Sequence, residues 1–67
     1  MDEKRLGLIA TLQSARSFYA EKRNNITASP MKKKTLDEII EVTDQLIEFI
    51  VKLDTLVSTY NHLEDKE

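Results

Sequence analysis

The stretch LDEIIEVTDQLIEFIVKLDTLVSTYNHL, residues 36–63, decides the fold of this 67-residue chain. Large apolar residues recur in it at alternating spacings of four and three, and we call them the heptad row: Ile39, Val42, Leu46, Phe49, Leu53, Leu56, Tyr60 and Leu63. This spacing keeps side chains on one face of an α-helix and is typical of coiled-coil packing. The heptad row therefore predicts a helix over about residues 35–63.

A second stripe of apolar residues runs beside the heptad row. Its members are Leu36, Ile40, Ile47, Ile50 and Val57. At ~100° per residue the two rows together cover roughly 160° of the helix, whereas about 100° is usual for a surface helix. We expect another helix of the same chain to cover the heptad row and a partner to cover the second stripe.

A shorter helix is predicted over about residues 3–23. Asp2 is a good N-cap residue. The apolar face of this helix is expected to follow Leu8, Leu12, Ala15 and Tyr19, which lie at spacings of four, three and four, and to be widened by Ile9 and Phe18. A connection over residues 24–34 then leads back to the long helix, so the chain is expected to be an antiparallel two-helix hairpin in a single all-α domain.

The start of the long helix is expected at Thr35. Thr35 followed by Glu38 has the pattern of a capping box, in which each side chain accepts a hydrogen bond from a backbone amide of the other residue. Ser29 and Pro30 suit an earlier, short turn.

Composition narrows the ways in which so small a domain is held together. There is no cysteine and a single histidine, His62, so disulfides and thiolate metal sites are excluded and we expect no metal or other cofactor. Because short chains bury little surface, we expect two hairpins to form a homodimeric four-helix bundle, with docking onto another helical protein as the alternative. No apolar run approaches the ~20 residues that span a bilayer, so we expect a soluble cytoplasmic protein without membrane contact.

Charge is distributed unequally between the two halves. Residues 1–34 carry eight Lys or Arg and three Asp or Glu, a net charge of +5, and residues 35–67 carry two and nine, a net charge of −7. Since exposed ion pairs contribute under ~1 kcal/mol each, this asymmetry is expected to orient the helices more than to stabilise them.

The leading functional hypothesis is a non-enzymatic protein–protein interaction module, such as a regulator, adaptor or chaperone-like subunit. The partner interface is expected at the second stripe together with two aromatic anchors, and comprises Ile40, Ile47, Phe49, Ile50, Val57 and Tyr60. Aromatic residues commonly dominate the energy of an interface.

A second alternative is RNA binding at the basic hairpin tip. Lys32, Lys33 and Lys34 are consecutive and resemble a phosphate-contacting patch. No aromatic residue is interleaved with them to stack on bases, and a solvated loop explains them as well.

Asp54 is the charge that interrupts the second stripe, between Ile50 and Val57. It marks either the polar rim of an apolar face or a catalytic carboxylate.

Two short elements resemble the small helical-hairpin aspartyl-phosphate phosphatases that regulate bacterial sporulation: Asp2-Glu3-Lys4-Arg5 with Leu8-Ile9, and Leu53-Asp54 with Leu56-Val57 and Tyr60. The resemblance implies a phosphatase of a phosphorylated response regulator, with Asp54 as its catalytic residue. Ile50-Val51-Lys52 stands where that family has Ser-Gln-Glu.

Overall fold

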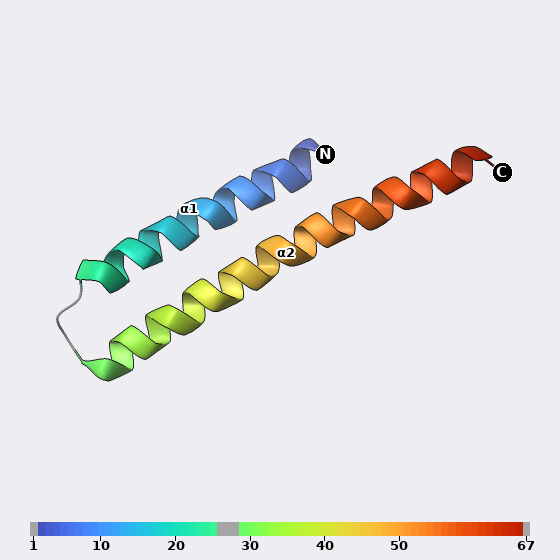
Figure 1. The fold of residues 1–67 in the computed structure, drawn as a ribbon. Helices are drawn as coiled ribbons and strands as arrows, with labels where there is room; N and C mark the ends of the chain where they lie inside the picture. The colour runs from blue at the N-terminus through green and yellow to red at the C-terminus, as the bar shows by residue number, and fades with distance from the viewer. Residues whose placement is uncertain (1, 26–28, 67) are drawn as a thin grey trace.

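The chain folds into two α-helices joined as a hairpin. The computed structural model describes residues 2–25 and 29–66, with α1 over Glu3–Asn25 and α2 over Pro30–Lys66 (Figure 1). The two helices pack against each other, and no strand occurs in these two ranges. The expected all-α hairpin is therefore confirmed.

Both helices begin at residues whose side chains or backbone complete the first turn. The Lys4 amide donates a hydrogen bond to Asp2 Oδ1 at 2.9 Å, as an N-cap requires. Pro30 is the first residue of α2, where its missing amide hydrogen costs nothing. The amides of Lys32 and Lys33 donate to the Ser29 carbonyl.

The long helix thus starts five residues before Thr35. The expected capping box does not form, because the Thr35 hydroxyl donates instead to the Met31 carbonyl one turn earlier, at 2.9 Å. Residues 30–34, expected in the connection, are the first turns of α2. Of the expected connection, residues 26–28 lie outside the described residues.

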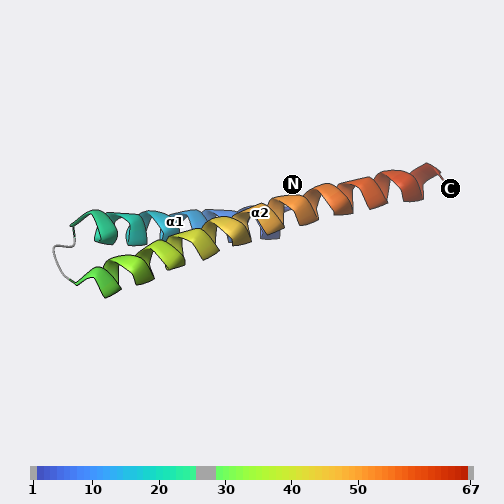
Figure 2. The same cartoon turned by 60° about the horizontal axis from the view of Figure 1, so that its bottom comes forward.

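The helices differ greatly in length. α1 has 23 residues and α2 has 37, and α2 continues through Lys66, beyond the expected end near residue 63. Figures 1 and 2 show α2 extending well past the start of α1. The molecule measures 59 × 18 × 11 Å, and its radius of gyration of 16.6 Å exceeds the ~11 Å of a compact domain of this size.

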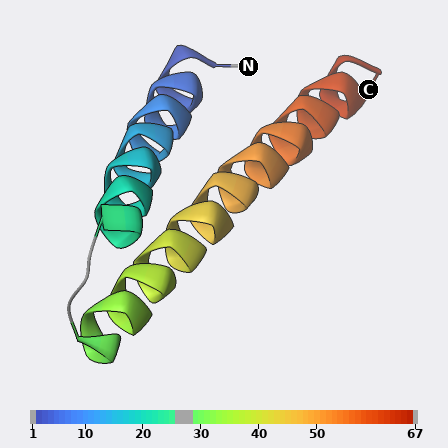
Figure 3. The same ribbon diagram turned by 60° about the vertical axis from the view of Figure 1, so that its left-hand side comes forward.

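A closed apolar core is absent from the described residues. No hydrophobic side chain among them is buried, and the buried residue is Thr43, whose hydroxyl donates to the Ile39 carbonyl at 2.7 Å. Figure 3 shows the two helices side by side as a single layer, with no third element over either face. Two helices in one layer leave most apolar side chains in contact with water.

Neither helix, over the residues described, is both long enough and apolar enough to cross a bilayer.

Candidate functional site

The face that α2 turns toward α1 is the second stripe. Its five members are half-buried, and Thr43 and Asp54 complete them into a row with spacings of four and three from Leu36 to Val57. Because α1 is the other described element, this burial arises from α1. The expectation that α1 covers the heptad row is therefore not met.

The matching row on α1 carries the three arginines of the chain. It consists of Arg5, Ile9, Leu12, Arg16, Tyr19 and Arg23, again at spacings of four and three. Ile9, expected at the edge of the apolar face, is half-buried, whereas Leu8 and Phe18 are exposed. Ile9, Leu12 and Tyr19 are half-buried and supply the apolar part of this contact.

Each arginine forms an ion pair with an aspartate of α2. These pairs are Arg5–Asp54 at 2.8 Å, Arg16–Asp44 at 2.6 Å, and Arg23–Asp37. The sums of the paired residue numbers are 59, 60 and 60, so the three pairs describe one antiparallel register. The aspartates lie in or directly beside the row that faces α1, so the three pairs favour this face of α2 over the heptad row.

Asp54 belongs to this interhelical contact. Its carboxylate accepts a hydrogen bond from Arg5 Nε, and the two side chains are 21% and 22% exposed. A carboxylate held in this way balances a neighbouring charge. The phosphatase expectation gives Asp54 a catalytic role, whereas in this structure Asp54 Oδ1 is engaged by Arg5.

The heptad row lies about 100° around α2 from α1, because most of its members directly precede a residue of the α1-facing row. Ile39 is half-buried and the other seven members are exposed, among them Phe49 at 66% and Tyr60 at 64%. Of the six residues expected at a partner interface, Ile40, Ile47, Ile50 and Val57 are half-buried on the face toward α1. Phe49 and Tyr60 face solvent.

The remaining candidate residues are exposed side chains of α2. Lys32, Lys33 and Lys34 lie on its first turns, and His62 lies near its C-terminal end. Within residues 2–25 and 29–66, no three His, Asp or Glu side chains are grouped as metal ligands.

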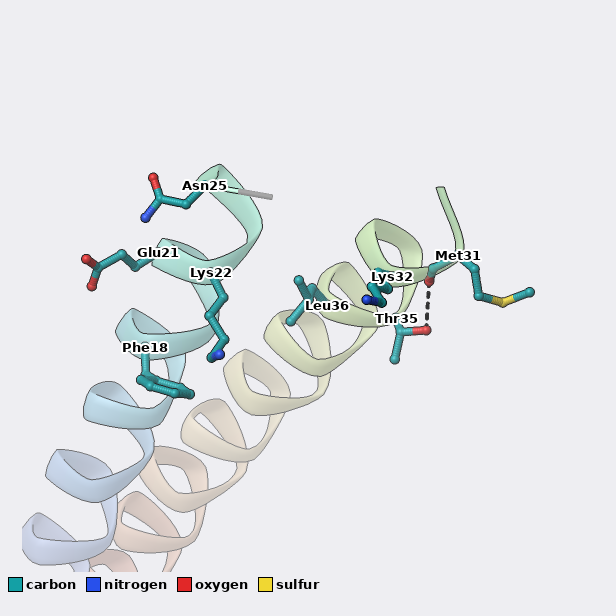
Figure 4. A pocket seen from close by; sticks show the side chains of 8 residues that line it. All are labelled: Phe18, Glu21, Lys22, Asn25, Met31, Lys32, Thr35 and Leu36. Carbon is teal, nitrogen blue, oxygen red and sulfur yellow. Dashed lines mark hydrogen bonds between the residues drawn. The ribbon is translucent and has the colours of Figure 1, made fainter. Parts of the chain in front are cut away.

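A groove of about 770 Å³ opens between the helices at the hairpin tip. We call it the tip groove, and its lining includes Phe18, Lys22, Met31, Lys32, Thr35 and Leu36. Figure 4 shows Phe18 and Lys22 of α1 and Leu36 of α2 pointing toward the space between the helices. The Lys22 ammonium lies 5.1 Å from the centroid of the Phe18 ring, a cation–π distance.

The tip groove is in register with the heptad row. Thr35 lies four residues before Ile39 and seven before Val42, so it continues the row toward the tip. Groove and row therefore form one continuous surface along α2. The sequence did not predict this groove. Its one signal was the four-residue spacing of Phe18 and Lys22, which places both side chains on one face of α1.

Comparisons of the chain with protein-family models, with curated proteins and with solved structures found no match.

Proposed function

We propose that the protein is a helical protein–protein interaction module, such as a regulator, adaptor or chaperone-like subunit, and that it binds its partner through the heptad row of α2. The observation that carries this proposal is a continuous line of seven large, exposed apolar side chains on a chain whose described residues bury no apolar side chain. A partner helix laid along this line supplies the missing core.

The exposed area supports a stable complex. The seven exposed members are each 45–66% exposed, and together they present an area on the order of the ~800 Å² that each partner buries in a standard-size interface. The largest apolar patch on a typical monomer is smaller, roughly 300–600 Å². The heptad row is therefore large enough to form a specific interface without a contribution from α1.

The spacing of the row favours a helical occupant. Side chains at alternating distances of three and four residues fit between those of another helix, as in coiled coils and in helix-binding grooves. Phe49 and Tyr60 are the largest exposed members, so they are the expected anchors.

In-cell photo-crosslinking tests the proposal. A photoreactive phenylalanine analogue replaces Leu53, which is in the heptad row, or Val51, which is not. Val51 is the matched control, because it is apolar, on the same helix and 45% exposed against 51% for Leu53.

The proposal predicts a discrete adduct from position 53 and none, or far less, from position 51. Mass spectrometry of the adduct identifies the partner. Equal labelling from both positions, or no adduct from position 53, would overturn the proposal.

A further inference from the structure

Within residues 2–25 and 29–66, no other helix lies beside the C-terminal part of α2. α1 begins after its cap at Asp2, and Arg5 pairs with Asp54, so the start of α1 lies opposite residues 56–57. The following segment, residues 58–66, is helical, and we call it the overhang. Tyr60 and Leu63 in the overhang are 64% and 56% exposed.

The overhang and the tip groove are at opposite ends of the same apolar surface. The heptad row runs from Ile39, one turn after the groove residue Thr35, to Tyr60 and Leu63 in the overhang. A second copy laid antiparallel along the row brings the overhang of each copy to the groove of the other. In such a symmetric dimer the overhang of each copy covers the tip groove of the other, so both overhangs and both grooves are buried.

The charges of the two ends favour this orientation. The tip is basic through Lys22, Arg23 and residues 32–34, whereas the overhang carries the two acids Glu64 and Asp65 against one base, Lys66. Antiparallel packing brings these opposite charges together, and parallel packing places like charges side by side at both ends. Lys22 makes no salt bridge with any carboxylate among the described residues.

One antiparallel register pairs every member of the heptad row with another member. The pairs between copies are Ile39 with Leu63, Val42 with Tyr60, Leu46 with Leu56, and Phe49 with Leu53. The same register brings Glu64 of the second copy to the level of residue 38. The interhelical ion pairs place Lys22 at that level too, since 22 and 38 sum to 60.

We infer that the occupant of the heptad row is a second copy of this chain, packed antiparallel, with its overhang docked at the tip groove and its Glu64 facing Lys22. The resulting assembly is a twofold four-helix bundle. This inference rests on the proposed function, because it names the partner of the same surface.

Single cysteines test the orientation, because the chain contains none of its own. Leu46→Cys and Leu56→Cys proteins are prepared separately, and sedimentation equilibrium first establishes that each, when reduced, is a dimer. Mild oxidation of the mixture is expected to give the 46–56 disulfide, because paired positions in such a bundle come within disulfide range. Each protein oxidised alone is expected to stay uncrosslinked.

The alternatives give different results. Disulfides of 46 with 46 or of 56 with 56, with no 46–56 disulfide in the mixture, overturn the antiparallel arrangement. A monomeric wild-type chain overturns the second copy as occupant, and the proposed function then stands if the position-53 crosslink contains a different protein. Failure of that crosslink as well removes both proposals.

Charge reversal supplies a test that keeps the heptad row intact. Lys22→Glu and Glu64→Lys should each raise the dimer dissociation constant about tenfold, because the dimer contains this contact twice and an exposed ion pair changes affinity a few fold. The double variant should recover most of the loss. Two additive losses without recovery would show that these residues do not face each other.

Discussion

The pair Arg5–Asp54 is expected to contribute more to the stability of the hairpin than the pair Arg16–Asp44. A double-mutant cycle isolates each contribution. The variants are Arg5→Gln, Asp54→Asn and their combination, with the corresponding Arg16→Gln and Asp44→Asn cycle as the control. Glutamine and asparagine keep much of the shape of each side chain while removing its charge.

The expected magnitudes follow from exposure. Two unit charges 4 Å apart attract by ~1 kcal/mol in bulk water and by ~4 kcal/mol at the effective dielectric constant near a protein surface. Side chains about one-fifth exposed, as in Arg5–Asp54, lie between these limits. After the cost of desolvation we expect a coupling of about 1.5 kcal/mol. Arg16 and Asp44 are 44% and 47% exposed, and there we expect about 0.5 kcal/mol.

Urea unfolding followed by circular dichroism at 222 nm measures both cycles. All variants are compared at one protein concentration, because the stability of an assembling protein depends on it. In 1 M salt, where the screening length falls to ~3 Å, the Arg16–Asp44 coupling should vanish and the Arg5–Asp54 coupling should persist in part. A coupling for Arg5–Asp54 no larger than that of the control pair would refute the expectation that lower exposure strengthens this pair, and a coupling of zero would refute the assignment of Asp54 to the interhelical contact.

Three further substitutions probe separate parts of the structure. Ile47→Ala should lower the free energy of unfolding by about 1–2 kcal/mol in urea titrations, since the side chain is half-buried against α1; an unchanged midpoint would place it in solvent. Asp2→Ala should cost about 1 kcal/mol in the same assay by removing the N-cap of α1, and Asp2→Asn, which keeps a capping oxygen, should cost much less. Lys52→Gln should tighten the antiparallel dimer about twofold in sedimentation equilibrium, because the proposed register brings Lys52 of each copy close to the other; a weaker dimer would exclude that register.

The sequence predicted the two helices and their order, because apolar periodicity and N-cap chemistry are local signals. Asp2 illustrates this, since its carboxylate accepts a hydrogen bond from the Lys4 amide only two residues away. Pro30 shows the limit of such signals. The capping-box pattern at Thr35 was the stronger local motif, yet proline at the first helical position extends α2 five residues further back.

Which of the two apolar rows of α2 packs against α1 could not be predicted from the sequence of α2 alone. Both rows have spacings of four and three. The row that faces α1 was harder to recognise in the sequence, because two of its positions, Thr43 and Asp54, are polar. The deciding signal was on the other helix, where Arg5, Arg16 and Arg23 share one face and require carboxylates opposite. Matching the spacings of arginines and aspartates across the hairpin identifies the contacting face. The tip groove depends on how two separate helices meet, so no single motif encodes it.

The exposed heptad row is tested most directly by the mass of the purified protein at equilibrium in the ultracentrifuge. At tens of micromolar, wild type and Val51→Lys should sediment at twice the chain mass of 7.8 kDa, whereas Leu53→Lys should sediment as a single chain with reduced helicity. A wild-type chain that is a fully helical monomer, with a stability that Leu53→Lys leaves unchanged, would contradict the account.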